Sequence, residues 1–180
     1  DYYRLYMKLL NKKYNQVYGQ YTSGAGFILK NKKNNLKVFS SKNINIYKKT
    51  IKSHMRRMGI DKQIKNKVIM DVGTGRQAIS FTDFKPKKIY HYDISRTNVK
   101  NFKKYINKKK LKNIYSNNVD LVEHKLPKNK FDLVYLHGIA QHFSHTGKGL
   151  INIFDAMKPN SYLWLYFYRS GTYAHFIHAI

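Results

Sequence analysis

Short apolar runs alternate with segments of helical spacing from Val68 onward, and this alternation constrains the fold more than any other feature of the chain. Strands are predicted at Val68–Val72, Ile89–Tyr92, Ile114–Ser116, Phe131–His137 and Tyr162–Tyr168. Between them the spacing predicts helices near Gln77–Phe84 and Lys148–Met157, and one capped by Ser95 with Val99, Phe102 and Ile106 on one face. Strands that alternate with helices are joined by right-handed crossovers. We therefore expect an α/β fold with a doubly wound, mainly parallel sheet and helices on both faces.

The first 60 residues show helical spacing without strand signals. Two stretches carry it, one with Tyr3, Tyr6, Met7, Leu10, Tyr14 and Val17 and one with Tyr47, Ile51, Met55 and Met58. Gly59 follows the second stretch and suits a helix end. We expect residues 1–60 to form a helical lead-in and residues 61–180 to form the ligand-binding core. Tyr18 and Tyr21 are candidates for a lid, although packing against the sheet is the simpler interpretation of the N-terminal tyrosines.

A glycine-rich turn follows the first predicted strand, in the stretch VIMDVGTGRQAISF. In a parallel sheet such a turn lies at the carboxyl ends of the strands, where ligands bind. Gly73 and Gly75 permit positive φ and a close approach of the backbone to a ligand. Asp71 ends the strand, and Asp93, 22 residues later, ends the neighbouring strand with two oxygens that could accept two ribose hydroxyls. The turn therefore predicts a ligand that carries a ribose.

Two cofactors fit this turn. The stretch from Gly73 to Ala78 satisfies the dinucleotide pattern G-x-G-x-x-G/A, and Asp93 has the spacing of the acid that binds its ribose. Asp71 weighs against a dinucleotide, because a carboxylate two residues before the first glycine would repel the phosphates. A ligand with a positive centre and an amino-acid tail suits Asp71 better. An NAD-dependent oxidoreductase is kept as a remote alternative.

The chain resembles the class I S-adenosylmethionine-dependent methyltransferases from about Tyr47 to Tyr168. The resemblance is carried, in order, by VIMDVGTGRQ, HYDIS, FDLVYLHGIAQHFSHTGKGL and AMKPNSYLWLY. The family has an acid-x-Gly-x-Gly turn, an acid that closes the second strand, Phe-Asp-hydrophobic-Val on the fourth strand and a Lys-Pro-Gly-Gly turn into the fifth. The ordered combination is far more specific than any single piece. It implies a Rossmann-like fold, methyltransferase activity and S-adenosyl-L-methionine as the cofactor.

The resemblance also assigns roles to individual positions. The residues that it places at the cofactor are Asp71, Gly73, Thr74, Gly75, Asp93, Ile94, Asn118, Asp120, Leu136 and His137. The acid and the glycines of the turn would border the methionine part, Asp93 would bind the ribose hydroxyls, and Ile94 would lie beside the adenine. Either Asn118 or Asp120 would contact the adenine edge. Leu136 and His137 would face the sulfonium and the substrate.

Three features depart from the family pattern. Gln77 stands where a third glycine is common, which would narrow the pocket. Asn160 and Ser161 replace the two glycines after the Lys-Pro pair, but asparagine tolerates the left-handed conformation, so we expect the turn to survive. The strands that close the sheet after the fifth are missing, and the chain begins at Asp1 without a methionine. We therefore expect a fragment or a trimmed chain.

Histidines are the candidates for catalysis. Methyl transfer needs few catalytic residues, because the cofactor supplies the reactive group, but a hydroxyl or protonated amine acceptor benefits from a base. His137 and His142 are the two candidates, and His142 aligns with a histidine that is frequent in the family. A structural or helix-capping role is the alternative for His142 and our main interpretation of His145. Asp132 is predicted to be structural, because its side chain should point away from the carboxyl end of its strand.

The sequence narrows the acceptor through what it lacks. Methylation of an exocyclic base amine commonly uses an Asn/Asp-Pro-Pro-aromatic motif after the fourth strand, where this chain has Tyr135-Leu136-His137-Gly138. Methylation of pyrimidine carbon-5 needs a cysteine nucleophile, and the chain has no cysteine. The lack of cysteine also excludes a zinc–thiolate site, and no metal site is predicted. A small-molecule acceptor with an oxygen or nitrogen nucleophile is the leading hypothesis.

The strongly basic composition keeps a nucleic-acid or protein acceptor open. The net charge is +26, and a cluster at Lys108–Lys110 and Lys112 could bind a phosphate backbone, with or without catalysis. Only six of the 35 basic residues are arginine, which makes bidentate phosphate contacts, so compositional drift over a solvated surface is the simpler interpretation. No stretch reaches the ~20 apolar residues of a membrane span, and no secretion signal begins the chain. We therefore expect a cytoplasmic protein.

Overall fold

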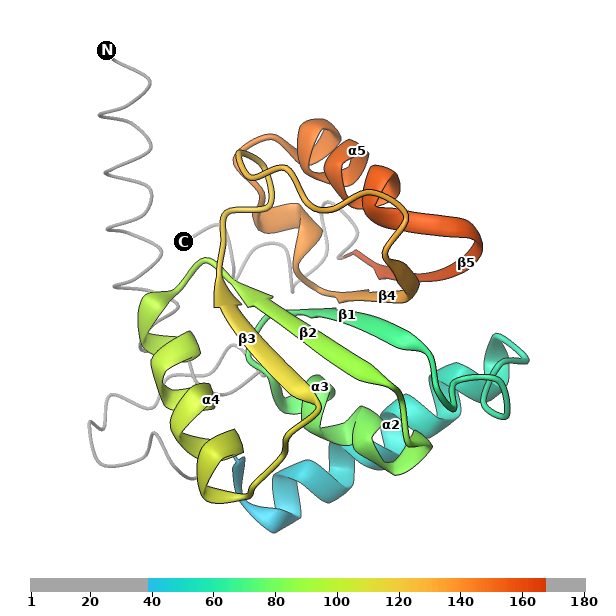
Figure 1. The fold of residues 1–180 in the computed structure, drawn as a ribbon, viewed down its shortest axis with the longest axis vertical. Coiled ribbons are helices and arrows are strands. Elements are labelled where there is room, and N and C mark those ends of the chain that lie inside the picture. The colour runs from blue at the N-terminus through green and yellow to red at the C-terminus, as the bar shows by residue number, and fades with distance from the viewer. Residues whose placement is uncertain (1–38, 168–180) are drawn as a thin grey trace.

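Five parallel strands form one sheet in the computed structural model, which describes residues 39–167 (Figure 1). The strands are β1 (Val68–Val72), β2 (Lys88–Asp93), β3 (Ile114–Asn118), β4 (Phe131–His137) and β5 (Met157–Tyr166). The helices are α2 (Ser41–Arg57), α3 (Arg76–Ser80), α4 (Arg96–Lys108) and α5 (Thr146–Ala156), with short 3-10 helices η3 (Phe81–Phe84) and η4 (Ala140–His142). None of these helices is both long and apolar enough to cross a membrane.

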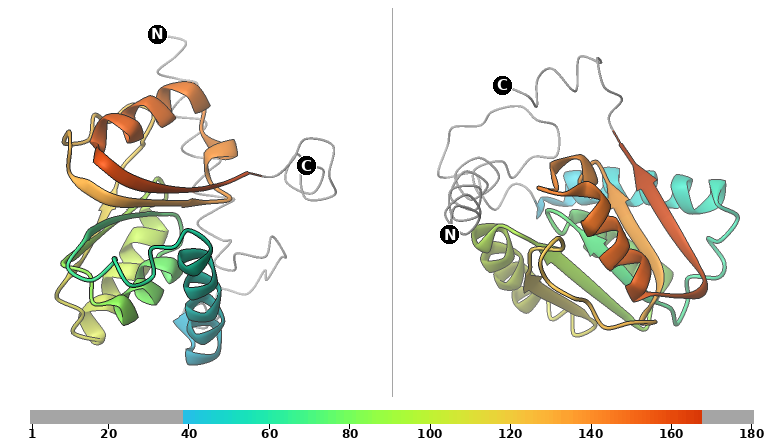
Figure 2. Two further views of the ribbon diagram at one scale, coloured as in Figure 1. Left: turned by 90° about the vertical axis from the view of Figure 1, so that its right-hand side faces the viewer. Right: turned by 90° about the horizontal axis from the view of Figure 1, so that it is seen from above.

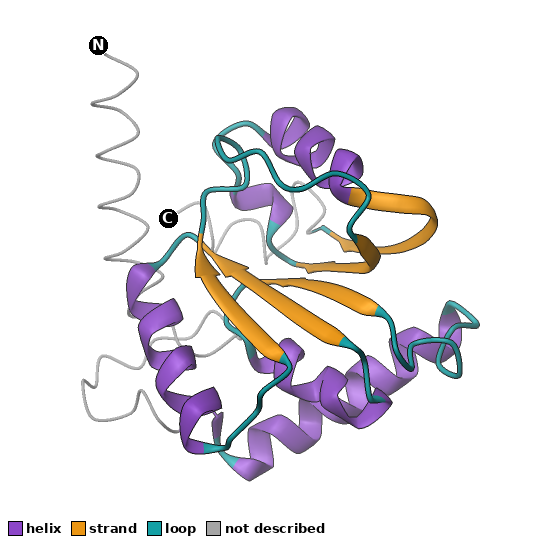
Figure 3. Ribbon diagram, viewed as in Figure 1, coloured by secondary structure: helices purple, strands orange, loops and turns teal. Residues whose placement is uncertain are grey.

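The sheet has the strand order β3-β2-β1-β4-β5, and every neighbouring pair is parallel. Helices α2, α3 and α4 cover one face and α5 covers the other (Figure 2 and Figure 3). The chain therefore winds in one direction from β1 to β3 and in the other from β1 to β5. The carboxyl ends of β1 and β4 flank the switch point at which ligands bind in such sheets. The predicted α/β, doubly wound, Rossmann-like fold is confirmed.

Two apolar clusters hold the three layers together, one on each face of the sheet. The cluster under α2, α3 and α4 includes Ile51 and Met55, which are completely buried, so α2 packs into the core although it falls within the predicted lead-in. The cluster under α5 includes Val134 and Ile153. The central strand β1 is buried from Ile69 onward, as expected for a parallel strand that is covered on both faces.

Most predicted elements match the structure closely. The bounds of β1 and β4 are as predicted, Ser95 caps α4 by accepting a hydrogen bond from the Asn98 backbone N–H, and Gly59 follows α2 with a φ of 70°. The start of the fifth strand was predicted too late. It begins at Met157 and not at Tyr162, because Met157 already pairs with Phe131 of β4. Asn160, with a φ of 58°, lies in the irregular stretch between this pair and the pair of Leu133 with Tyr162. The turn residue predicted to tolerate the left-handed conformation does so.

Asp132 joins three strands at the amino end of the sheet. One carboxylate oxygen accepts the Val68 backbone N–H of β1 at 2.8 Å, and the other accepts Lys158 Nζ of β5 at 2.9 Å. Burial opposes ionisation of this carboxyl, but the Val68 N–H and the Lys158 ammonium outweigh it and hold the pKa of Asp132 below its usual range. The predicted structural role of Asp132 is confirmed.

Several predictions fall on other parts of the chain. Three predictions lie outside the described residues: the helix expected over residues 2–18, the lid candidates Tyr18 and Tyr21, and the end of the fifth strand at Tyr168.

Candidate functional site

The glycine turn between β1 and α3 is shaped by two close contacts. Gly73 and Gly75 have φ values of 121° and 84°, in the region that glycine adopts without strain. A Cβ atom on Gly75 would lie 2.8 Å from the ring of Phe102, and one on Gly73 would lie 3.0 Å from the side chain of Ile139. A side chain on Gly75 would therefore overlap the Phe102 ring, whereas one on Gly73 would require the end of the Ile139 side chain to shift. The predicted need for glycine at both positions agrees with this geometry.

Asp71 lies at the base of the turn and is completely buried. Its Oδ2 accepts the backbone N–H of Ala78 at 3.0 Å, whereas its Oδ1 has no hydrogen-bond partner among the residues that the structure describes. Burial raises the pKa of Asp71 from 3.8 to about 7, and the charge of Asp93 adds to this effect, while the Ala78 N–H and Arg76 oppose it. A buried oxygen without a donor is costly, and a ligand that brings a donor removes the cost.

Arg76 is the cation of this site, and no local sequence pattern indicated its role. Its side chain is buried, with Nε donating to Thr74 Oγ1 at 3.0 Å and the guanidinium 4.5 Å from the ring centre of Tyr47 in α2. Burial lowers the pKa of Arg76, while Tyr47 and Asp71 oppose that effect. Arg76 therefore connects the turn to α2. Thr74, predicted at the cofactor, serves here as the acceptor for Arg76.

Asp93 ends β2 beside the turn, as predicted, and is buried. Its Oδ1 accepts the Ser95 backbone N–H at 2.7 Å and its Oδ2 accepts Asn98 Nδ2 at 2.9 Å. Burial raises the pKa of Asp93 to about 7, although these two donors lower it. Each oxygen keeps a second lone pair, so the carboxylate can still accept two hydroxyls. Sequence reasoning missed Asn98, because its contact depends on how the first turn of α4 folds over the strand end.

The two candidates for the adenine edge occupy different places. Asn118 pairs with Asp93 in the sheet, and its Nδ2 donates to the backbone oxygens of Asp93 at 3.0 Å and Ile94 at 2.8 Å. Asp120 instead accepts the Val122 backbone N–H at 2.9 Å and so shapes the next turn. Asn118 is therefore the candidate that the structure brings against the end of β2. Which of the two contacts adenine stays a prediction.

His137 ends β4 within a stack of rings. Trp164 of β5 donates its indole N–H to His137 Nδ1 at 3.1 Å, and His54 of α2 lies face to face with Trp164 at a centroid distance of 3.9 Å. Because indole can only donate, the neutral His137 ring must carry its proton on Nε2. Burial lowers the pKa of His137, which favours this neutral form. His137 therefore offers a hydrogen-bond donor at Nε2 and not a free basic nitrogen.

His54 fastens α2 to the sheet at the same place. Its Nδ1 lies 2.9 Å from the hydroxyl of Tyr135, and its ring covers Trp164. Burial lowers the pKa of His54 to about 4, and the nearby His137 and Arg57 add to this effect. The side chain of Leu136, which was predicted to face the sulfonium, lies in the apolar cluster under α5. Only the backbone of Leu136 is available to border a ligand at this strand end.

The remaining histidines of the loop after β4 have different roles. His145 caps α5, since its Nδ1 accepts the Lys148 backbone N–H at 3.2 Å, which agrees with the structural role predicted for it. His142 ends η4 and is half-buried, with its Nε2 3.5 Å from Gln141 Nε2. The helix-capping alternative therefore applies to His145 and not to His142. A catalytic role for His142 stays a prediction.

A family model described as a methyltransferase domain matches residues 70–165, which contain the turn, both buried aspartates and the end of β4. The chain belongs to this family of methyltransferase domains. Its motifs and its fold are those of the class I S-adenosylmethionine-dependent methyltransferases, as the resemblance predicted. Among curated proteins, no sequence matches the chain.

Solved structures share the fold of this methyltransferase domain. One is the YcgJ protein of Bacillus subtilis, with 18% identity, 59% of this chain and 47% of that chain covered, and a TM-score of 0.52. A second is an S-adenosylmethionine-dependent methyltransferase of Aquifex aeolicus, which is 21% identical and has a TM-score of 0.51. The match covers 69% of this chain and 71% of that one. A third is the [4+2]-cyclase SpnF, which is 17% identical and has a TM-score of 0.57. The match covers 67% of this chain and 47% of that one. The chain thus spans about half the length of YcgJ and of SpnF.

Proposed function

We propose that this chain binds S-adenosyl-L-methionine and transfers its methyl group to an oxygen or nitrogen atom of a small molecule. The observation that carries the proposal is the pair of buried aspartates at the ends of β1 and β2. Asp71 has an oxygen without a donor among residues 39–167, and Asp93 has spare lone pairs beside a turn in which a side chain at Gly75 would overlap Phe102. An ammonium group and two vicinal hydroxyls would satisfy these acceptors, and S-adenosylmethionine carries both.

Different residues of the site would bind different parts of the cofactor. Asp71, Gly73 and Gly75 would hold the methionine part, and Asp93 would hold the ribose, with Ile94 and Asn118 toward the adenine. When bound, the cofactor supplies a methyl group on a positively charged sulfur, which is a strong electrophile. The protein then has to orient the acceptor and exclude water. Methyl transfer of this kind asks for alignment more than for a set of catalytic side chains.

The end of β4 and the loop that follows it support an acceptor site with two different histidines. His137 offers an N–H at Nε2, because Trp164 occupies its other nitrogen, so it would orient an acceptor oxygen. His142 lies in the next turn of the chain and is the candidate base for an acceptor hydroxyl or amine. The chain lacks the motif and the cysteine that the two nucleobase routes use. These features together favour a small acceptor.

Calorimetry with S-adenosylhomocysteine tests cofactor binding without knowledge of the acceptor. The wild-type chain is expected to bind, and Asp93→Ala is expected to lose binding while remaining folded by circular dichroism. Asp155→Ala, which removes an exposed carboxyl from α5, is the matched control and should bind normally. A folded wild-type chain that shows no binding of S-adenosylhomocysteine would refute the proposal. Heat on titration with NADH in its place would support the oxidoreductase.

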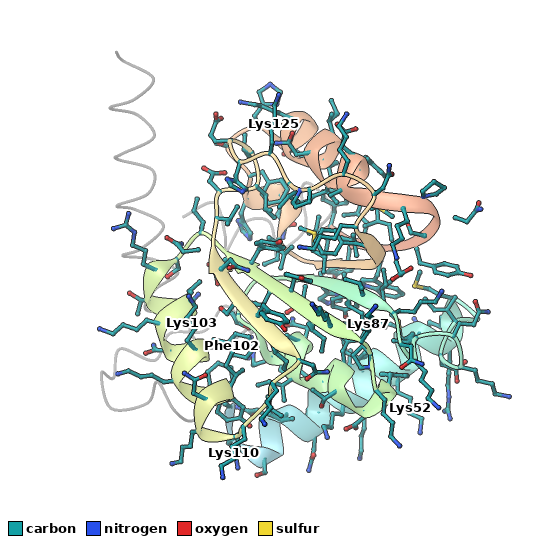
Figure 4. The ribbon with its side chains drawn as sticks, in the orientation of Figure 1. Lys52, Lys87, Phe102, Lys103, Lys110 and Lys125 are labelled. Atoms are coloured by element: carbon teal, nitrogen blue, oxygen red, sulfur yellow. The ribbon has the colours of Figure 1, made fainter. Side chains whose placement is uncertain are left out.

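The basic surface of α4 supports a second candidate, an RNA acceptor or an RNA-binding role. No acidic residue occurs between Ile94 and Val119, and none of the ion pairs within residues 39–167 uses a lysine of this segment. The exposed lysines here are Lys100, Lys103, Lys104, Lys108, Lys109, Lys110 and Lys112. Lys103 and Lys110 project away from the sheet, whereas Phe102 points toward it (Figure 4). Such an unopposed row of ammonium groups is suited to a phosphate backbone.

Fluorescence anisotropy with a labelled single-stranded RNA tests this second candidate. Binding should weaken steeply as salt rises and should be lost when the lysines at the end of α4 are reversed in charge. The variant is Lys108→Glu, Lys109→Glu and Lys110→Glu, and the control with the same change of charge on α2 is Lys42→Glu, Lys49→Glu and Lys52→Glu. Equal loss in both variants would indicate non-specific attraction to the net charge and would count against an RNA site on α4.

A further inference from the structure

His91 lies in the middle of β2, two residues before Asp93, and is completely buried. Both of its ring nitrogens have partners. Nε2 contacts the backbone oxygen of Gly73 in the glycine turn, and Nδ1 lies 2.8 Å from Ser116 Oγ on β3. The ring edge meets Phe102 at a centroid distance of 4.6 Å. The side chain therefore spans from β3, across β2, to the turn that follows β1.

The partners of His91 determine which nitrogen carries the proton. A carbonyl oxygen can only accept, so Nε2 must donate to Gly73. In the neutral ring Nδ1 is then the acceptor, and the Ser116 hydroxyl donates to it. Burial lowers the pKa of His91 to about 4, although the bond to Gly73 opposes this, so the neutral form is the one present near pH 7. Ser116 thus selects the form of His91 that can hold the turn.

Both backbone polar groups of Gly73 form hydrogen bonds with residues of β2. Its N–H donates to the backbone oxygen of Tyr92 at 3.0 Å, and its carbonyl accepts from His91 Nε2. Without the imidazole, a buried carbonyl in a turn at a φ of 121° would lose its donor. The two bonds connect the turn to the strand that ends in Asp93. The distance between the methionine side and the ribose side of the site therefore depends on His91.

We propose that His91 is the positioning residue of the glycine turn. Its Nε2–H holds the Gly73 carbonyl and so keeps the turn and Asp93 at the separation that S-adenosylmethionine requires. This inference rests on the proposed function. His91 does not touch the cofactor, and it acts through the backbone of Gly73. A histidine that merely filled the core would need neither the proton on Nε2 nor a partner on Ser116.

A pair of variants separates these two roles. Glutamine has an amide N–H that can reach the same carbonyl, whereas methionine has a similar length and no donor. His91→Met is expected to weaken binding of S-adenosylhomocysteine by about tenfold, the effect of one lost hydrogen bond, and His91→Gln should recover most of the affinity. Ile89→Ala, which opens a cavity on the same strand, is the control for loss of stability alone and should retain normal affinity.

The protonation state of the ring gives a readout that needs neither a variant of His91 nor a bound ligand. Nitrogen-15 chemical shifts of the wild-type chain should show a neutral His91 with its proton on Nε2, and Ser116→Ala should shift population toward the other neutral form. Ser116→Ala leaves the ring in place, so it tests the inference even if the His91 variants do not fold. Its affinity should fall, because the Nδ1–H form cannot donate to Gly73.

The outcomes distinguish this inference from the function on which it rests. A folded wild-type chain that fails to bind S-adenosylhomocysteine would overturn the proposed function and the inference together. Wild-type binding with equal affinity in His91→Met would overturn the inference alone. A wild-type ring with its proton on Nδ1 would do the same, because that form has no donor for the turn.

Discussion

Asp71→Asn should change the stability of the free chain in opposite directions at low and at high pH. Asp71 is completely buried, and burial raises its pKa from 3.8 to about 7. The folded chain therefore binds this proton more tightly than the unfolded chain does. The sign follows directly: the stability contributed by the protonated form is complete below about pH 4 and is lost as the pH rises through 7. Asparagine cannot ionise, so the variant has no such loss.

The magnitude comes from the same pKa and from the two oxygens of Asp71. At about 1.4 kcal/mol for each pKa unit, ionisation costs the folded wild type roughly 4 kcal/mol above pH 7. Asparagine keeps an acceptor for the Ala78 N–H. It also places an amide NH₂ where Oδ1 has no partner among the described residues, which costs about 1–3 kcal/mol at every pH. The variant should therefore be less stable than wild type by about 1–3 kcal/mol at pH 4 and more stable by a similar amount at pH 8.

Urea denaturation at several pH values between 4 and 8 measures this inversion as a difference between the two chains. The difference is needed because His54 and His91, whose pKa values burial lowers to about 4, contribute stability that rises with pH over part of the same range. Asp155→Asn, at an exposed carboxyl, is the control and should follow wild type. Wild-type and Asp71→Asn curves that run parallel from pH 4 to pH 8 would refute the argument that burial raises the pKa of Asp71.

Three further predictions follow from the same site. Gly75→Ala should lower the free energy of unfolding by about 2–4 kcal/mol in urea titrations, because it adds overpacking to left-handed strain. Gly59→Ala, whose Cβ would meet no atom of the described residues, should show only the strain of about 1–2 kcal/mol. Trp164→Phe should release His137 Nδ1, which nitrogen-15 spectra would show as a mixture of the two neutral forms; an unchanged spectrum would contradict the assigned hydrogen bond. The affinity for S-adenosylhomocysteine should rise between about pH 6 and pH 8, because binding favours the ionised forms of the two buried aspartates, and calorimetry in two buffers should detect the released protons.

The sequence predicted most accurately the strands whose ends are marked by glycine or polar residues. The strand β1 stops at a glycine turn, and β4 is an apolar run bounded by polar residues, so both were placed to the residue. The start of β5 was missed because Asn160 turns within a polar stretch that does not look like a strand. The start of β5 is determined by its pairing with β4, and the local sequence pattern does not show which strands pair.

The site was predictable to the extent that its residues stand at strand ends. Asp71 and Asp93 were found because a parallel sheet brings such ends to one edge. Arg76, Asn98 and His91 were missed, because each has its role through a partner that only the folded chain supplies. His91 illustrates the limit: a polar residue between two tyrosines in a strand looks like a solvent-facing position, and its partners lie 18 and 25 residues away. No local signal could have shown that both of its nitrogens are engaged.

The position of Asp132 has a consequence for the order in which the chain folds. Its two partners lie 64 residues before it and 26 residues after it, so its hydrogen bonds close the long loops of the fold. The strands β1, β2 and β3 can assemble first from contiguous chain, whereas β4 must find β1 across that span. In this order of assembly the contacts of Asp132 form late, and removal of its carboxylate is expected to speed unfolding more than it slows folding.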